Sequence, residues 1–260
     1  MTTTHIGWAG LAASLVLIAV AIVLSGWQGL RLTRSIAWAS VRAAVQLVLV
    51  GFALRLVLDP AASVWWSWLW VALMIGFAGT VIRNRAREVP GALALGTLSM
   101  LVVIAVSLAV VLGLGIFPTE GRTIVPLAGM MIGNSMTSCV LVGRRIVGEI
   151  TDKSDEVEAR LSLGLTGPEA ARPYVRTALR TALIPQVEST KAVGLVFLPG
   201  AMTGLVLAGV DALDAVTVQL AIMYLILGSV ATSVTVMALG LSRRLFTADQ
   251  RLVPLDRRGE

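Results

Sequence analysis

Residues 156–185 read EVEARLSLGLTGPEAARPYVRTALRTALIP, and they interrupt a chain that is otherwise dominated by long apolar segments. Acids, bases, glycine and proline alternate in this stretch, whereas the neighbouring segments carry few charges. Charged residues are costly inside a bilayer, so a polar stretch of this length is expected at the membrane surface. The pattern indicates two short amphipathic helices, joined by a glycine-containing turn, on one side of a membrane.

The composition of the whole chain is that of a membrane protein. Of 260 residues, 57% are hydrophobic and 14% are charged, whereas about 25% of the residues of an average soluble domain are charged. The formal net charge is +6, which raises the question of a nucleic-acid partner. The basic residues lie in loops on one side of the predicted membrane, so a lipid bilayer is the expected partner and nucleic acid is not.

Seven apolar segments are each long enough to cross a bilayer, which takes about 17 residues or more as a helix. They cover residues 6–26, 36–58, 64–82, 91–117, 124–147, 179–210 and 215–241. Alternation of period two is absent, and the lipid interior requires backbone groups that are satisfied within the segment, so helices are expected. The sequence predicts an all-α, polytopic membrane protein with about seven transmembrane helices in a single domain, residues 1–260.

The loop charges predict an orientation. Basic residues follow the first, third, fifth and seventh segments, whereas the opposite loops are mainly acidic. Because cytoplasmic loops carry the excess of arginine and lysine, the N-terminus is expected outside and the C-terminus in the cytoplasm. The basic residues of the predicted cytoplasmic loops include Arg31, Arg34, Arg83, Arg85, Arg87, Arg144, Arg145, Lys153, Arg243 and Arg244. The expected location is the cell (inner) membrane.

The polar segment between about residues 150 and 180 contains clear helix-end signals. Gly164 is expected to end the first short helix, because glycine is common just after a helix C-terminus. The run from Thr166 to Glu169 fits a capping box, with Pro168 in the first turn of the next helix. Pro173 is expected to break or bend that second helix one turn later.

This polar segment resembles the EAA loop of ATP-binding-cassette permeases, in the run EARLSLG at residues 158–164, followed by Pro168 and later by Pro185. In that family the loop is a coupling helix, which docks into a groove on a separate ATPase subunit. The resemblance implies a coupling role for Glu156, Glu158, Arg160, Leu161, Gly164 and Glu169, with the apolar face around Leu161 as the anchor.

Two further stretches, residues 124–136 and 184–204, resemble the signature stretches of the FetB-like permeases. Bacterial members of that family are assigned to iron export, and plant relatives are tied to aluminium tolerance and sugar-nucleotide transport. The resemblance implies a permease subunit of an ATP-binding-cassette exporter for iron or another metal ion, acting as a homodimer. Two alternatives stay open: a permease for another substrate such as a sugar nucleotide, and a secondary transporter or channel that uses an ion gradient.

The sequence contains no G-x-x-x-x-G-K-[ST] motif, the backbone cradle that binds nucleotide phosphates. The chain is therefore not expected to be an enzyme or to bind a cofactor, and ATP with its Mg²⁺ is expected on the partner subunit. The single cysteine, Cys139, and the single histidine, His5, give no metal-binding pattern, so no resident metal site is predicted.

Several polar residues fall inside the predicted spans, and such residues point to a translocation path or gate. They are Arg42, Gln46, Asn134, Gln186, Glu188 and Lys191. A cluster of internally paired polar residues that ties helices together is the competing interpretation. Glu188 and Lys191 are three residues apart and can pair along one helix face. The sixth segment, residues 179–210, is too long for one straight crossing, so a break is expected near Pro199 and Gly200.

Overall fold

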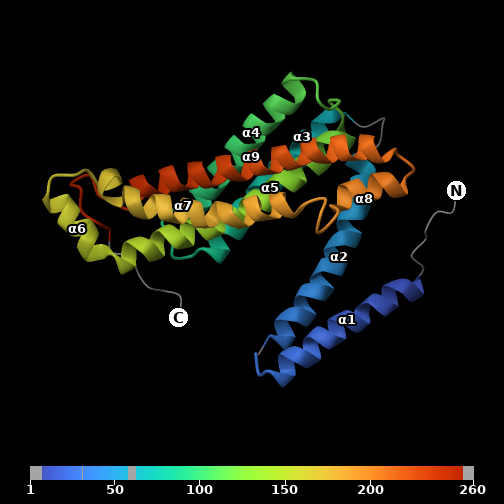
Figure 1. Cartoon of the computed structure of the whole chain (residues 1–260), viewed down its shortest axis with the longest axis horizontal. Coiled ribbons are helices and arrows are strands. Elements are labelled where there is room, and N and C mark those ends of the chain that lie inside the picture. The colour runs from blue at the N-terminus through green and yellow to red at the C-terminus, as the bar shows by residue number, and fades with distance from the viewer. Residues whose placement is uncertain (1–7, 31, 58–62, 254–260) are drawn as a thin grey trace. The chain divides into compact units, whose positions relative to one another are not determined.

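A computed structural model describes residues 8–30, 32–57 and 63–253, and within these ranges it is almost entirely helical. The nine helices of the described ranges are α1 (Trp8–Trp27), α2 (Thr33–Val57), α3 (Val64–Arg85), α4 (Ala92–Gly113), α5 (Gly121–Asp152), α6 (Ser154–Ser162), α7 (Gly167–Ala192), α8 (Gly200–Leu207) and α9 (Ala212–Arg244) (Figure 1). The predicted all-α fold class of a polytopic membrane protein is confirmed.

Five of the described helices are long and apolar enough to cross a membrane, namely α2, α3, α4, α5 and α9, and α1 adds a shorter apolar stretch, Leu15–Trp27. The sixth predicted segment corresponds to the end of α7 and the whole of α8, which residues 193–199 separate. The predicted break is therefore present, and Pro199 is the N-cap of α8. Proline suits a helix start, because its fixed φ angle is compatible with the first turn.

The second helix of the polar segment is longer than predicted. Instead of a short surface helix, α7 continues for 26 residues and passes through both Pro173 and Pro185. The prediction was that Pro173 breaks or bends this helix, and the break is wrong because the helix is continuous. A proline in the second turn removes one intrahelical hydrogen bond, and neighbouring residues of α7 such as Ala170, Tyr174 and Ala178 are buried against the rest of the fold. This packing keeps the helix continuous across the proline.

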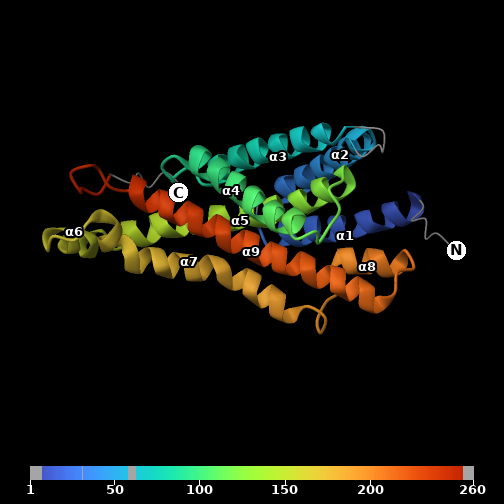
Figure 2. The ribbon, with the colours of Figure 1, turned by 90° about the horizontal axis from the view of Figure 1, so that it is seen from above.

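The chain divides into two compact units, residues 1–62 and residues 63–260. In the first unit, α1 packs against α2. The second unit is a helical bundle in which α5 and α9 form the central pair. Figure 2 shows α3 and α4 on one side of this pair and α7 on the other, in agreement with the packing of α5 against α3, α7 and α9.

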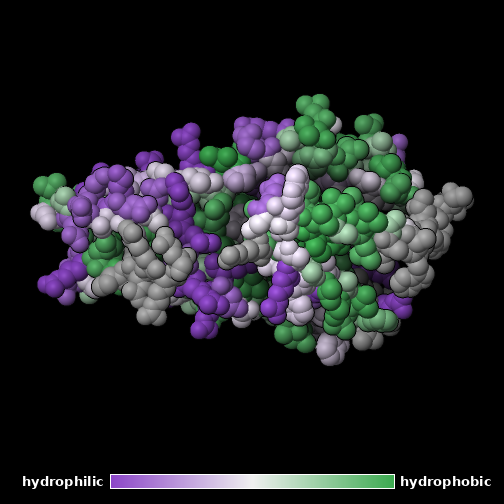
Figure 3. Space-filling view, turned by 90° about the horizontal axis from the view of Figure 1, so that it is seen from below, coloured by the Kyte–Doolittle hydropathy of each residue, from purple (hydrophilic) through white to green (hydrophobic). Residues whose placement is uncertain are grey.

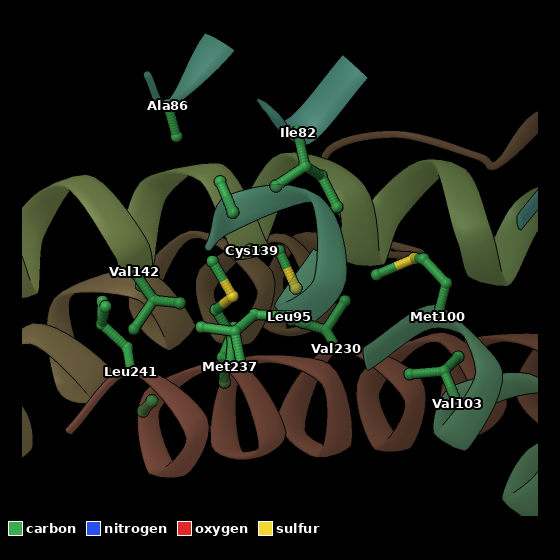
Figure 4. Close-up of a cluster of buried hydrophobic side chains, with 14 of the residues drawn as sticks. Ile82, Ala86, Leu95, Met100, Val103, Cys139, Val142, Val230, Met237 and Leu241 are labelled. Atoms are coloured by element: carbon green, nitrogen blue, oxygen red, sulfur yellow. The ribbon is translucent and has the colours of Figure 1, made fainter. Parts of the chain in front are cut away.

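The core of the second unit is closely packed around sulfur-containing and branched side chains. Figure 4 shows Met237 and Cys139 between the helices, with Ile82 and Met100 nearby. All four side chains are buried, and the Cys139 thiol donates a hydrogen bond to the Ser233 carbonyl oxygen at 3.6 Å. Cys139 is thus a packing residue, as free cysteines in cores usually are.

Small residues let the helices of this bundle approach one another. A Cβ atom on Gly96 would lie 2.9 Å from Ile82 Cδ1, and one on Gly143 would lie 3.2 Å from Met237 Cε. Close backbone approach at glycine is a common way to pack helices in membranes, where burial of apolar surface gives no advantage over lipid.

Candidate functional site: the elbow around α6

The polar segment forms an elbow at one end of the bundle. We call residues 153–169 the α6 elbow; it comprises α6, its flanking turns and the start of α7. In Figure 1, α6 lies beyond the ends of α5 and α7, at the end of the bundle where α9 finishes. Figure 3 shows hydrophilic side chains gathered over this end of the molecule. The elbow is thus a polar projection from a bundle of apolar helices.

The apolar face of α6 packs against its own chain. Val157 is completely buried, and Leu161 is half-buried against the hydrophobic core. A helix of nine residues is too short to be stable alone, so its apolar face is needed for tertiary packing. Leu161, which the sequence suggested as an outward anchor, therefore faces inward. The apolar side chain left outward is that of Leu163, which is 83% exposed, with Leu165 beside it at 38%.

A set of polar contacts fixes α6 on α7. Lys153 Nζ lies 2.8 Å from Glu156 Oε1, and the Tyr174 hydroxyl donates to Glu156 Oε2 at 2.9 Å. The Arg160 guanidinium lies 5.8 Å from the centroid of the Tyr174 ring. The hydrogen bonds from Lys153 and Tyr174 lower the pKa of Glu156. Burial, followed by the bond to Glu156, raises the pKa of Tyr174.

The elbow should loosen in acid because of Glu156. Since its pKa is lower in the folded chain, its stabilising effect is full above the carboxyl pKa of the unfolded chain and is lost as the pH falls through the folded value. The protection factors of the amides of residues 154–162, which correct for the slower intrinsic exchange in acid, should therefore fall between neutral and acidic pH. Glu156→Gln should have lower protection factors at neutral pH, and these should change little further in acid. An unchanged pH profile in this variant would contradict the role given to Glu156.

The turn between α6 and α7 has the predicted capping residues. Gly164 has a positive φ angle of 89°, a conformation that favours glycine after a helix. Thr166 is the N-cap of α7, and its backbone N–H and its hydroxyl donate to Glu169 Oε2 at 2.9 and 2.7 Å. These bonds lower the pKa of Glu169. The predicted capping box is confirmed, and it sets the direction in which α7 leaves the elbow.

A contact from the C-terminal end of the chain also holds the elbow. Residues 245–253, here called the C-terminal hairpin, fold back so that Phe246 forms an antiparallel bridge with Leu252. The Gly167 N–H donates to Gln250 Oε1 at 2.6 Å, which satisfies an amide of the first turn of α7. A Cβ atom on Gly167 would lie 2.7 Å from Phe246 Cδ2. The sequence analysis did not predict this contact. The one local feature that could have indicated it is the glycine at the first position of α7, Gly167.

The structure places the candidate translocation residues at several positions. Lys191 Nζ lies 2.9 Å from Glu188 Oε1, so the predicted pair is confirmed; the two side chains are 67% and 61% exposed. Asn134 donates to the Met130 carbonyl oxygen of its own helix at 2.8 Å. Gln186 is half-buried, and Arg42 and Gln46 are exposed on α2, in the first unit. Glu188 and Lys191 are thus the two of these six that the described contacts bring together.

The pair at the end of α7 can be tested with a double-mutant cycle. Lys191→Met leaves the Glu188 carboxylate without its cation, so this change should impair folding or transport more than the double change Glu188→Gln with Lys191→Met. An exposed pair in water contributes about 0.2–1 kcal/mol, whereas breaking a buried pair costs about 3–5 kcal/mol. Thermal unfolding of the four proteins in lipid nanodiscs measures the coupling. Additive effects of the two single changes would show that the pair contributes no coupling energy.

Metal-ligating side chains are dispersed over the described residues. Among them, no three histidine, cysteine, aspartate or glutamate side chains come together as a metal site would require. Asp211, at the other end of the bundle, instead accepts a hydrogen bond from the Leu213 N–H at 2.9 Å and so caps α9.

Comparison with known proteins places the chain in a family. The model of the Uncharacterised protein family (UPF0014) matches residues 8–246. A UPF0014 membrane protein of Synechocystis sp. is 37% identical over 256 residues, which cover 96% of this chain and 97% of that protein. The protein ALUMINUM SENSITIVE 3 of Arabidopsis thaliana is 33% identical over 222 residues, or 85% and 81% of the two chains.

A bacterial relative has a more informative name. The probable iron export permease protein FetB of Escherichia coli is 30% identical over 256 residues, which cover 97% of each chain. No solved structure matches the chain. The resemblance to the FetB-like permeases seen in residues 124–136 and 184–204 is confirmed by this match over the whole chain. The chain is a multi-pass membrane protein that belongs to the UPF0014 family.

Proposed function

We propose that this chain is the membrane-spanning permease subunit of an ATP-binding-cassette exporter, with iron or another metal ion as its cargo. Two copies form the translocation path, and a separate ATPase subunit, which binds ATP and Mg²⁺, docks on the α6 elbow of each copy. The chain itself performs no catalysis. Its part is to convert movement of the bound ATPase into movement of the membrane helices.

The geometry of the α6 elbow carries this proposal. A partner that moves a permease needs a projecting segment that is held firmly to the permease and that has an exposed surface to which the partner binds. Buried Val157 and the contacts of Glu156 with Lys153 and Tyr174 hold α6 on α7. Leu163 then presents an exposed apolar side chain at the end of α6. A few apolar residues can carry most of the binding energy of a protein interface, and Leu163 is available for that role.

α7 connects the elbow to the break in the sixth span. Its 26 residues extend about 39 Å, which is more than the thickness of a bilayer core. At its far end lie the Glu188–Lys191 pair and then residues 193–199, where the helix is interrupted before α8. Discontinuous helices often line transport sites. A displacement of α6 would therefore reach the interrupted region through one continuous helix.

The orientation follows from the charges at the elbow end of the bundle. α3, α5 and α9 finish at this end, and each carries arginine in its last two or three turns, for example Arg83, Arg145 and Arg243. By the positive-inside rule this is the cytoplasmic end, where an ATPase has access to ATP. The N-terminus is then outside and the C-terminus is cytoplasmic, in the inner membrane.

The name of the bacterial relative FetB supports a metal ion as the cargo. FetB is named as a probable iron export permease, and the two chains align over 97% of their lengths. The name of the Arabidopsis relative refers to aluminium sensitivity. A metal ion is therefore the first cargo to test, and a sugar nucleotide is the comparison substrate.

Reconstitution tests the proposal. The chain is inserted into liposomes with its cognate ATPase subunit, and movement of Fe²⁺ is followed with an enclosed chelating dye. Transport should require both the ATPase and ATP, and it should stop when the nucleotide-binding lysine of the ATPase is changed to alanine. A sugar nucleotide should not compete. Equal transport by the chain alone under an ion gradient would instead establish a secondary transporter.

A further inference from the structure

A basic pocket opens at the loop between α3 and α4, apart from the α6 elbow. Its volume is about 530 Å³, and its lining includes Arg83 and Asn84 at the end of α3, Arg87 in the loop, and Gly91 and Leu93 at the start of α4. The pocket thus combines two guanidinium groups with an apolar wall. It lies at the junction of α3 and α4, two helices that are long and apolar enough to cross a membrane.

The positive charge of this pocket is not neutralised from within the described part of the chain. Neither Arg83 nor Arg87 lies within ion-pair distance of a described carboxylate. A third guanidinium lies beside them, because a Cβ atom on Gly91 would be 2.9 Å from Arg244 Cζ. Three like charges around one hollow repel one another, so a bound anion would stabilise the arrangement.

The carboxylate nearest in sequence to these arginines, that of Glu88, already forms an ion pair with another residue. Glu88, in the same loop, accepts from Arg144 Nε at 2.7 Å, and Arg145 pairs with Glu149 at 2.9 Å on the same helix. Arg144 and Arg145 of α5 are therefore paired, whereas Arg83 and Arg87 at the pocket are available to bind an external anion. Arginine is well suited to that task, because its planar fork matches the oxygens of a phosphate.

The position of the pocket favours a lipid as the source of the phosphate. On α3, Leu73 and Phe77 are 60% and 56% exposed, and Asn84 follows on the same helix face at a spacing of seven residues. Leu93, which lines the pocket, is 40% exposed at the start of α4. Exposed apolar side chains thus follow the pocket along α3 and at the start of α4, and an occupant with a polar head and apolar tails fits this arrangement.

We propose that this pocket binds the phosphate of an anionic lipid headgroup in the leaflet on the α6 side of the membrane. The headgroup must carry net negative charge, because the quaternary ammonium of a zwitterionic lipid would bring a further cation close to Arg83, Arg87 and Arg244. Basic pockets at the cytoplasmic ends of membrane helices bind anionic headgroups by this chemistry. The site needs no ATPase and no cargo, so it stands independently of the proposed transport function.

Lipid titration of the purified full-length chain in neutral detergent tests the proposal. Phosphatidylglycerol should raise the midpoint of thermal unfolding, and phosphatidylcholine at the same mole fraction should have little effect. Each guanidinium removed should weaken binding about fivefold, so Arg83→Gln with Arg87→Gln should weaken it roughly 25-fold. Arg85→Gln is the matched control, because Arg85 lies in the same turn of α3 but outside the lining.

Each contrary result would overturn the lipid site. Equal stabilisation by the two lipids would remove the electrostatic argument, and an equal loss in Arg85→Gln would show a diffuse surface charge. Protection by inorganic phosphate as strong as that by phosphatidylglycerol would identify a site for a soluble anion. Unchanged lipid binding in the double variant, with weaker association of the ATPase subunit, would identify a protein interface.

Discussion

Replacing Gly167 by alanine is expected to detach the C-terminal hairpin from the α6 elbow. The added Cβ atom would lie 2.7 Å from Phe246 Cδ2 and 2.8 Å from Phe246 Cβ, far inside van der Waals contact. Overpacking of this kind costs about 1–3 kcal/mol, and loss of the hydrogen bond to Gln250 adds about 1 kcal/mol. Hydrogen exchange in the first turn of α7 should accelerate about tenfold or more, because exchange follows the local opening equilibrium. Cargo-stimulated ATPase activity should fall.

A matched control separates this contact from a general effect of alanine. Gly148, in α5, has nothing within 4 Å of an added Cβ atom, so Gly148→Ala should leave coupling unchanged and raise stability slightly, by about 0.5–1 kcal/mol. Phe246→Ala removes the clash and should restore most of the coupling when it is combined with Gly167→Ala, which gives a non-additive pair. If Gly167→Ala retained full coupling and normal exchange, the hairpin would have no part in holding the elbow.

Much of the helical framework was predictable from local sequence. The segment 64–82 became α3 over Val64–Arg85, and the capping residues Thr166 and Glu169 stand where the pattern placed them. Apolar periodicity, charge in the loops and cap residues act over a few positions, so they are visible in the sequence alone. The Glu188–Lys191 pair belongs to the same class, since helical geometry brings residues three apart together.

Contacts between distant elements were not predictable in this way. The bond from Gly167 to Gln250 joins residues 83 positions apart, and no local pattern records it. Pro173 also shows the limit of a local rule, because the burial of its neighbours outweighs the one hydrogen bond that it removes.

The direction of the apolar face of α6 was equally undetermined by its sequence. An amphipathic helix has the same pattern whether its apolar face meets its own chain or a partner. The structure buries Val157 and partly buries Leu161, and it leaves Leu163 exposed. We therefore still propose the α6 elbow as the coupling site, but with Leu163 in place of Leu161 as the apolar residue that contacts the ATPase.

Leu163→Asp is therefore expected to abolish productive docking of the ATPase while the permease still inserts and folds. An apolar side chain at the centre of an interface typically contributes about 2 kcal/mol or more, which corresponds to roughly 30-fold weaker association. The ATPase should no longer copurify, and cargo should no longer stimulate it. Glu158→Ala, at an exposed position of α6, should be milder and should mainly alter association rate and salt dependence.

Two comparisons make the Leu163 result specific. Leu161→Asp should also uncouple, but by loosening α6 itself, so hydrogen exchange over residues 154–162 should rise in that variant and stay normal in Leu163→Asp. Leu213→Asp is the matched exposed control, because Leu213 is 77% exposed in the first turn of α9, at the opposite end of the bundle (Figure 1). Normal copurification and stimulation with Leu163→Asp would show that the ATPase does not bind this elbow, and the ion-gradient mechanism would then be the better account of the chain.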